Sequence, residues 1–179
     1  CGFFIMMFSM ATLDAPKFDS FKEAVSKQFG GEYTSPTKEN AKYATQILQE
    51  LGVSQESIVF HDALGVAIVF ESTMFFDTLS AEVRPQGKAV LEGVVASIAK
   101  RQKDTNKQFK VVVEGHTDDR PILSGMYPSN WELSGARASR VVRLFLDQGF
   151  APDKLTAIGY GHARPWVNSR RADGTQDET

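Results

Sequence analysis

Residues 111–142 read VVVEGHTDDRPILSGMYPSNWELSGARASRVV, and this stretch indicates a strand, a loop and a helix in succession. The β-branched run Val111–Val113 is typical of a central strand that is covered on both faces. The loop after it contains Pro, Gly and Ser residues, which exclude regular structure. Ser129 or Asn130 then caps a helix over Trp131–Gln148. This order of elements predicts an α/β domain.

Polar side chains gather where that helix begins. At 100° per residue, Asn130, Ser134 and Arg137 lie on one flank of its first turns, away from the solvent-exposed stripe. In open α/β sheets ligands bind outside the carboxyl ends of the strands, where a helix N-terminus favours anionic groups. Asp118 follows the strand closely, so we expect it to face Arg137 across a small cleft. Such a pair suits a ligand with an ammonium group and a carboxylate, and a purely structural ion pair is the alternative.

The same stretch resembles the OmpA-like peptidoglycan-binding domains. The matching positions are Gly115, Thr117, Asp118, Asn130, Leu133, Ser134, Arg137, Ala138 and Val141. Within this superfamily, Tyr127–Ser134 is similar to the corresponding segment of flagellar motor stator B subunits. The domain resemblance covers Met74–Pro165, and the stator-type resemblance extends back to Phe3.

The resemblance implies a binding site. It assigns peptidoglycan contacts to Thr117, Asp118, Asn130, Leu133, Ser134 and Arg137. In the family, the residues that match Asp118 and Arg137 bind the diaminopimelate of the stem peptide, which carries an ammonium group and a carboxylate. No cofactor and no metal ion are expected.

The expected fold class is α/β, an α+β sandwich in which helices pack on a mixed sheet. The OmpA-like domain is expected over residues 57–165, preceded by a linker and a helix over residues 32–56. Apolar patterns predict one helix before this domain, at Lys38–Leu51. Within the domain they predict a hairpin of Ser57–His61 with Leu64–Phe70, a helix at Ala81–Arg101 and a strand at Leu155–Tyr160.

Residues 1–13, CGFFIMMFSMATL, carry no charged side chain before Asp14. The run is shorter than the roughly 20 residues of a membrane-spanning helix. We interpret it as the outer end of a transmembrane helix whose beginning is missing. A buried amphipathic segment and a lipoprotein acylated on Cys1 are the alternatives.

Residues 14–31 predict an amphipathic helix. Phe18, Phe21, Val25 and Phe29 lie on one of its faces, and charged residues occupy the rest. In stator B subunits the corresponding segment is the plug, which lies along the membrane and closes the ion path. A helix packed on the globular domain is the alternative.

Residues 166–179 predict a polar tail without apolar periodicity. OmpA-like domains continue with a last strand that reads like NRRV, and neither Arg170 nor Arg171 matches it. We therefore expect the final strand of the family to be missing and one edge of the sheet to be unpaired.

Composition excludes several classes of function. The chain has 179 residues with a net charge of −2, and its basic residues are scattered, so no nucleic-acid footprint is present. Glu114, His116, Asp118 and Asp119 are close in sequence, but strand alternation at Glu114 splits side chains between two faces, and His61 and His162 lack metal-ligand spacing with His116. The sequence contains no nucleophile elbow and no phosphate loop. We expect the protein not to be an enzyme.

These observations predict the periplasmic part of a flagellar stator B-type subunit that anchors the ion-driven stator to peptidoglycan. The expected location is the inner membrane, with a single pass and the C-terminal domain in the periplasm. The expected partners are peptidoglycan, the stator A-type channel subunit and a second copy of the chain. The alternative is a general envelope tether of the OmpA or Pal kind without a role in ion flow; a plug helix beside a membrane segment favours the stator.

Overall fold

The computed structural model describes residues 3–9, 36–61 and 65–163. In chain order the elements are β1 (Phe3–Ser9), α2 (Pro36–Glu50), β2 (Ser57–His61), β3 (Val66–Glu71), the short 3-10 helix η1 (Ser72–Met74), α3 (Pro85–Thr105), β4 (Lys110–Gly115), α4 (Asn130–Asp147), the 3-10 helix η2 (Pro152–Lys154) and β5 (Leu155–Gly159).

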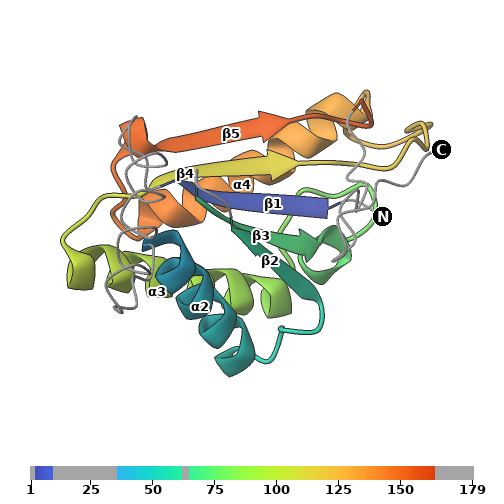
Figure 1. The fold of residues 1–179 in the computed structure, drawn as a ribbon. Coiled ribbons are helices and arrows are strands. Elements are labelled where there is room, and N and C mark those ends of the chain that lie inside the picture. The colour runs from blue at the N-terminus through green and yellow to red at the C-terminus, as the bar shows by residue number, and fades with distance from the viewer. Residues whose placement is uncertain (1–2, 10–35, 62–64, 164–179) are drawn as a thin grey trace.

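The strands form one mixed sheet in the order β2-β3-β1-β4-β5, with β1 in the middle (Figure 1). Strand β1 pairs antiparallel with both β3 and β4, and β2 pairs antiparallel with β3. Strands β4 and β5 are parallel, and α4 provides the crossover that a parallel pair requires. The predicted α/β class with helices packed on a mixed sheet is confirmed.

The expected membrane helix at residues 1–13 is wrong for the residues described there. Phe3–Ser9 is a β-strand, and its backbone pairs with Val66–Glu71 on one side and with Lys110–Gly115 on the other. A short continuous apolar run is as typical of a central strand as of a helix segment, and periodicity alone does not separate the two. No helix in the described part of the chain is long and apolar enough to cross a membrane.

The prediction that the final strand is missing and leaves one sheet edge unpaired stays a prediction, because residues 164–179 lie outside the described residues. Strand β1 lies between β3 and β4 and is hydrogen-bonded to both, so neither β3 nor β4 is an edge strand. The edge strands of the sheet are β2 and β5. The predicted plug over residues 14–31, with Phe18, Phe21, Val25 and Phe29, and the polar tail over residues 166–179 lie outside the described residues.

The remaining sequence predictions agree with the structure within a few residues. The expected hairpin is β2 and β3, the helix expected at Lys38–Leu51 is α2, and the helix expected at Ala81–Arg101 is α3. Helix α3 begins later than expected because Phe76 and Val83 form an isolated antiparallel bridge before Pro85, which takes the first helical position.

The hydrophobic core lies between the sheet and helices α2, α3 and α4. Val111 and Val113 of β4 are almost completely buried, whereas Val112 and Glu114 on the opposite face are partly exposed. Alternate residues of a strand point to opposite faces, so β4 presents one face to the helices. The largest fully buried side chains include Phe70, Phe75, Leu91, Val95, Val141 and Phe145.

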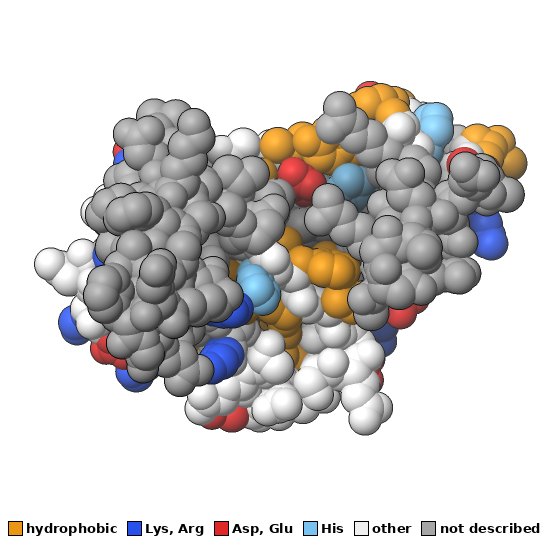
Figure 2. All heavy atoms as spheres, in the orientation of Figure 1, with side chains coloured by type: hydrophobic (Ala, Val, Ile, Leu, Met, Phe, Trp, Pro, Cys, Tyr) orange, Lys and Arg blue, Asp and Glu red, His pale blue; other side chains and the backbone are white. Residues whose placement is uncertain are grey.

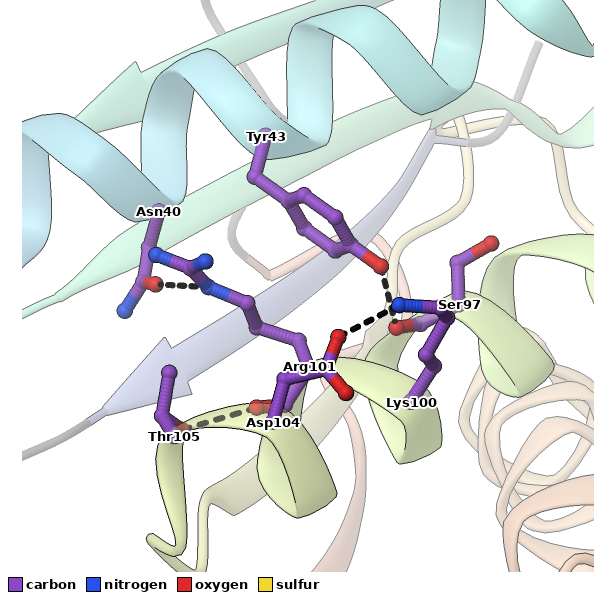
Figure 3. Close-up of polar contacts among 7 residues, drawn as sticks. All are labelled: Asn40, Tyr43, Ser97, Lys100, Arg101, Asp104 and Thr105. Atoms are coloured by element: carbon purple, nitrogen blue, oxygen red, sulfur yellow. Dashed lines mark hydrogen bonds and ion pairs between the residues drawn. The ribbon is translucent and has the colours of Figure 1, made fainter.

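Helix α2 is attached to α3 by polar contacts at the rim of the core (Figure 3). The Tyr43 hydroxyl donates to the backbone carbonyl of Ser97 at 2.9 Å, and the Arg101 guanidinium lies over the Tyr43 ring, 5.1 Å from its centroid. Arg101 Nε also donates to Asn40 Oδ1 at 3.1 Å. Helix α2 is therefore part of the folded domain, and the predicted separation of residues 32–56 from residues 57–165 does not describe how this helix packs.

Candidate functional site

The candidate site lies where β4 and β5 end side by side. Beyond the two strands, backbone pairing continues: Tyr160 N donates to Gly115 O and Thr117 N donates to Gly161 O, both at 2.9 Å. The loop that carries Thr117 and Asp118 is thus held against the segment that follows β5. This place is the carboxyl end of a parallel strand pair, where α/β sheets bind ligands.

Helix α4 approaches these two strands closely at their glycines. A Cβ atom on Gly115 would lie 2.3 Å from the Ser134 carbonyl oxygen, and one on Gly159 would lie 2.5 Å from the Gly135 nitrogen. Only a residue without a side chain fits at either position. The Ser134 hydroxyl donates to the Trp131 carbonyl and accepts from Gly161 N, each at 3.0 Å. Ser134 is fully buried, so it fixes the segment after β5 and does not face solvent.

Asn130 holds the loop that follows β4. Its Nδ2 donates to the carbonyl oxygens of Asp118 at 3.2 Å and Arg120 at 2.8 Å. The side chain is buried, and because it sits at the first residue of α4, it ties the loop to the start of that helix. Asn130 positions the loop in this structure, Leu133 is buried as well, and the predicted contact of both residues with peptidoglycan stays a prediction.

Arg137 is buried beneath the segment that connects β3 and α3. Its Nε donates to the Ser80 carbonyl at 2.8 Å and its Nη2 to the Asp77 carbonyl at 3.0 Å. The guanidinium lies over the Phe76 ring, 5.1 Å from the centroid. Burial lowers the pKa of Arg137 below its ordinary value, while Tyr127 and Asp118 act in the opposite direction. These contacts hold the guanidinium in one orientation with respect to the sheet.

Asp118 lies within electrostatic reach of Arg137, as expected, but the two side chains form no ion pair within residues 65–163. Among the described residues, Asp118 forms an ion pair with Arg120, Oδ2 to Nε at 3.7 Å, and the Arg120 side chain is largely exposed. The purely structural ion pair between Asp118 and Arg137 is therefore absent. The Asp118 side chain is about one-third exposed, at 36%, so its carboxylate is accessible from solvent.

Thr117 adds a polar atom to the same place. The residue is 94% buried, as its exposed fraction of 6% shows, and its Oγ1 has no hydrogen-bond partner among the described residues. Buried hydroxyl groups in proteins are normally hydrogen-bonded, so an exception requires an explanation. This atom is also closed off from solvent, so the hydroxyl belongs to the interior of the site.

His116 and Glu114 lie next to the loop residues Thr117 and Asp118 in sequence and contact each other and Tyr160. The His116 ring stacks on Tyr160 with 5.0 Å between centroids, and its Nε2 lies 3.5 Å from Glu114 Oε2. His116 is buried, which suits a structural role better than ligation. Within residues 3–9, 36–61 and 65–163, no group of three or more His, Cys, Asp or Glu side chains is arranged to hold a metal ion.

Sequence reasoning missed two features of this site. The carbonyl groups of Asp77 and Ser80, which orient Arg137, carry no sequence signature because every residue has a carbonyl group. The helix pattern, in which Trp131 falls on the apolar side together with Gly135, Ala138, Val142 and Phe145, predicts a covered ring, but Trp131 is 48% exposed beside Gly161. At the first turn of a helix, the face on which a residue lies is a weak guide to its burial, because the end of a helix can extend beyond the elements packed against it.

The fold and the site together define a class of protein: a mixed α/β domain with an acid and a buried guanidinium at the end of its parallel strand pair. A sequence model described as the OmpA family matches residues 75–178. The chain belongs to the OmpA family.

Individual relatives agree with this assignment. The chain is 31% identical over 183 residues to the uncharacterized protein YtxE of Bacillus subtilis (strain 168), covering 91% of this chain and 73% of that protein. It is 27% identical over 111 residues to motility protein B of the same strain, covering 62% of this chain but only 41% of the relative. The resemblance to this type of protein that the motifs indicate is confirmed.

A solved structure shows the same fold. The crystal structure of a MotB-like protein from Desulfovibrio vulgaris superposes with a TM-score of 0.65 at 24% identity, covering 77% of this chain and 85% of that one. At 24% identity, this similarity shows that the two proteins share a fold.

Proposed function

We propose that this chain binds peptidoglycan without covalent chemistry, through the Asp118 carboxylate and the Arg137 guanidinium. The observation that carries the proposal is the arrangement of these two groups. Asp118 is accessible at the end of β4, and Arg137 is held near it by two backbone carbonyls and not by Asp118 itself. Both charges can therefore serve a ligand that brings an ammonium group and a carboxylate.

The geometry supports diaminopimelate of the stem peptide as the group that is recognised. Its free end carries one ammonium group for Asp118 and one carboxylate for Arg137. Among the described residues, the hydrogen bonds of Arg137 use Nε and Nη2, which leaves Nη1 for the ligand.

Co-sedimentation of the chain with purified peptidoglycan tests this proposal. Asp118→Asn should lower the bound fraction at least about tenfold, because a charge-assisted hydrogen bond to an ammonium group is lost. Asp119→Asn removes the same charge one residue away, at an exposed position, and should bind like wild type. Equal binding by wild type and Asp118→Asn would contradict the assignment of the site.

Peptidoglycan with lysine in place of diaminopimelate provides a second test. Lysine at that place in the stem peptide keeps the ammonium group and lacks the carboxylate, so the ligand group proposed for Arg137 is absent. We expect clearly weaker sedimentation with the lysine type. We also propose that the protein is not an enzyme, so the muropeptide profile after incubation should be unchanged.

We further propose that the protein is a flagellar stator B-type subunit in the periplasm, with a channel-forming A-type subunit and a second copy of itself as partners. The match to motility protein B and the segment Tyr127–Ser134 support this role. The membrane helix expected at residues 1–13 is not part of the proposal, because Phe3–Ser9 is a strand.

Ion flow separates the stator from a general envelope tether. Expressed in its natural full length with an A-type subunit, the protein should leak ions and slow growth when Pro16–Phe29 is deleted. Unchanged growth and unchanged cytoplasmic pH and sodium would favour the tether. Analytical ultracentrifugation at rising concentration tests self-association. A strictly monomeric species would also favour the general envelope tether over the stator subunit.

A further inference from the structure

Exposed apolar side chains gather around the site at the carboxyl ends of β4 and β5. Trp131 is half-exposed as the second residue of α4, and Leu123 and Met126 are largely exposed in the loop between β4 and α4. Figure 2 shows hydrophobic side chains at this end of the molecule, at its upper right, together with a histidine and charged side chains. Apolar groups rimmed by polar ones mark binding surfaces, and tryptophan is enriched among the residues that contribute most to binding.

The Trp131 ring is fixed from one side. A Cβ atom at Gly161 would lie 3.2 Å from Trp131 Cδ2 and 3.3 Å from Trp131 Cγ. These two atoms are bonded to each other, and no other atom of the side chain is nearer to that position, so Gly161 lies against a face of the indole and not against its edge. Because about half of the residue is exposed, the opposite face is available to a ligand.

The same backbone that fixes the indole also carries Asp118. Thr117 N donates to Gly161 O at 2.9 Å, so the residue before Asp118 is hydrogen-bonded to the residue under the ring. Asn130, directly before Trp131, donates to the Asp118 carbonyl oxygen at 3.2 Å. Trp131 therefore borders the Asp118 site and is held in place by contacts on both sides of it.

We propose that the exposed face of Trp131 stacks on a sugar ring of the peptidoglycan glycan strand while Asp118 and Arg137 bind diaminopimelate. This inference rests on the peptidoglycan-binding function proposed above. One face of a pyranose ring presents C–H groups, which suit the negative face of the indole π-system. Two stem-peptide residues separate diaminopimelate from the sugar, a span of about 10 Å. Residues 131 and 137 are about 9 Å apart along the axis of α4, so one muropeptide can reach both.

Isothermal titration calorimetry of the full chain with two ligands tests the proposal. The first ligand is the free tripeptide L-alanyl-γ-D-glutamyl-diaminopimelate, and the second is the same tripeptide on N-acetylmuramic acid. Wild type should bind the muramyl tripeptide about fivefold more tightly than the free one. Trp131→Leu keeps an apolar side chain without an aromatic face, so it should lose this preference and bind the free tripeptide like wild type. Trp131→Phe should retain part of the preference.

The matched control is Leu146→Ala, which removes another exposed apolar side chain of α4. This residue lies about 22 Å from Trp131 along the helix axis, so the variant should keep the preference for the muramyl tripeptide. Asp118→Asn should lose affinity for both ligands alike. Absence of binding of either ligand to wild type would overturn the peptidoglycan function and this inference with it. Equal affinities of wild type for the two ligands, or an equal loss for both in Trp131→Leu, would overturn the stacking alone.

Fluorescence gives a signal that a purely structural role of Trp131 would not change. The chain has two tryptophans, so Trp166→Phe leaves Trp131 as the single indole. The muramyl tripeptide should shift its emission to shorter wavelength, because the sugar displaces water from the ring, and the free tripeptide should leave it unchanged. Identical spectra with the two ligands would also overturn the stacking.

Discussion

Arg137 Nη2 donates to the backbone carbonyl of Asp77 at 3.0 Å, across 60 residues of sequence. With the bond from Nε to Ser80 O, this contact joins helix α4 to the segment that leads into α3. A residue expected to bind a ligand thus also stabilises the fold, through backbone carbonyls and not through the ion pair with Asp118. Arg137→Ala is therefore an ambiguous test of binding, and Asp118→Asn is the better one.

The first prediction concerns the stability that Arg137 provides. Arg137→Ala should lower the free energy of unfolding by about 2 to 3 kcal/mol, because charged hydrogen bonds to two backbone carbonyls are lost. Urea denaturation measures this value. Arg143→Ala, whose exposed pair with Asp147 is 3.4 Å long, should change stability by about 0.5 kcal/mol or less. Equal stability of Arg137→Ala and wild type would contradict the contacts described.

The second prediction compares two glycines. Gly115→Ala places a methyl group 2.3 Å from the Ser134 carbonyl oxygen, which is backbone and cannot move aside, so we expect a loss of about 2 to 3 kcal/mol. Gly135→Ala, inside α4 with nothing within 4 Å of the new methyl group, should gain about 0.5 to 1 kcal/mol of helix stability. Thermal unfolding of both variants gives the comparison. Similar melting temperatures would refute the close approach of α4 to β4.

The third prediction concerns pH. The Ser129 hydroxyl donates to the Glu132 carboxylate, and this bond lowers the pKa of Glu132 from its ordinary value of 4.5. A carboxyl group with a depressed folded pKa stabilises the protein above its unfolded pKa and loses this contribution as pH falls through the folded pKa. Wild type should therefore be more stable than Glu132→Gln near neutral pH, and the difference should shrink below pH 4.5. Denaturant midpoints of both proteins along a pH series measure it, and a difference that does not vary with pH would count against the interaction.

The fourth prediction concerns the strand at the start of the chain. The backbone of Phe3–Ser9 pairs on both sides, so its amide groups should exchange with solvent as slowly as those of β3 and β4. Hydrogen exchange with peptide-level mass spectrometry measures this in the full chain. Met6→Pro removes a backbone donor from the middle of β1 and leaves its acceptor unpaired, so it should destabilise the domain by about 1 to 3 kcal/mol. Rapid exchange over Phe3–Ser9, together with an unchanged stability of Met6→Pro, would contradict the pairing of β1 with β3 and β4.

Some features followed from the sequence with little help from tertiary structure. Ser129 accepts from Trp131 N at the start of α4, as the pattern Ser129–Asn130 predicts, because capping is decided within four residues. Val111–Val113 identifies β4 and Gly149 follows α4 for equally local reasons. The glycines and small polar residues of the OmpA pattern led to the correct family for a different reason: close packing of α4 on β4 and β5 admits few residue types, so this tertiary contact is visible in the sequence.

Other features were decided only by tertiary structure. Phe3–Ser9 reads equally well as a strand or as part of a helix, and the partners that make it a strand lie more than 50 residues away in sequence. Arg137 was expected to face Asp118, but its donors bind carbonyl groups of a segment about 60 residues earlier, and carbonyl groups leave no mark in a sequence. Local patterns therefore determined which elements form, because hydrogen bonding and capping act over a few residues. Long-range contacts determined where β1 and the Arg137 guanidinium lie, because these depend on groups that only the folded chain brings together.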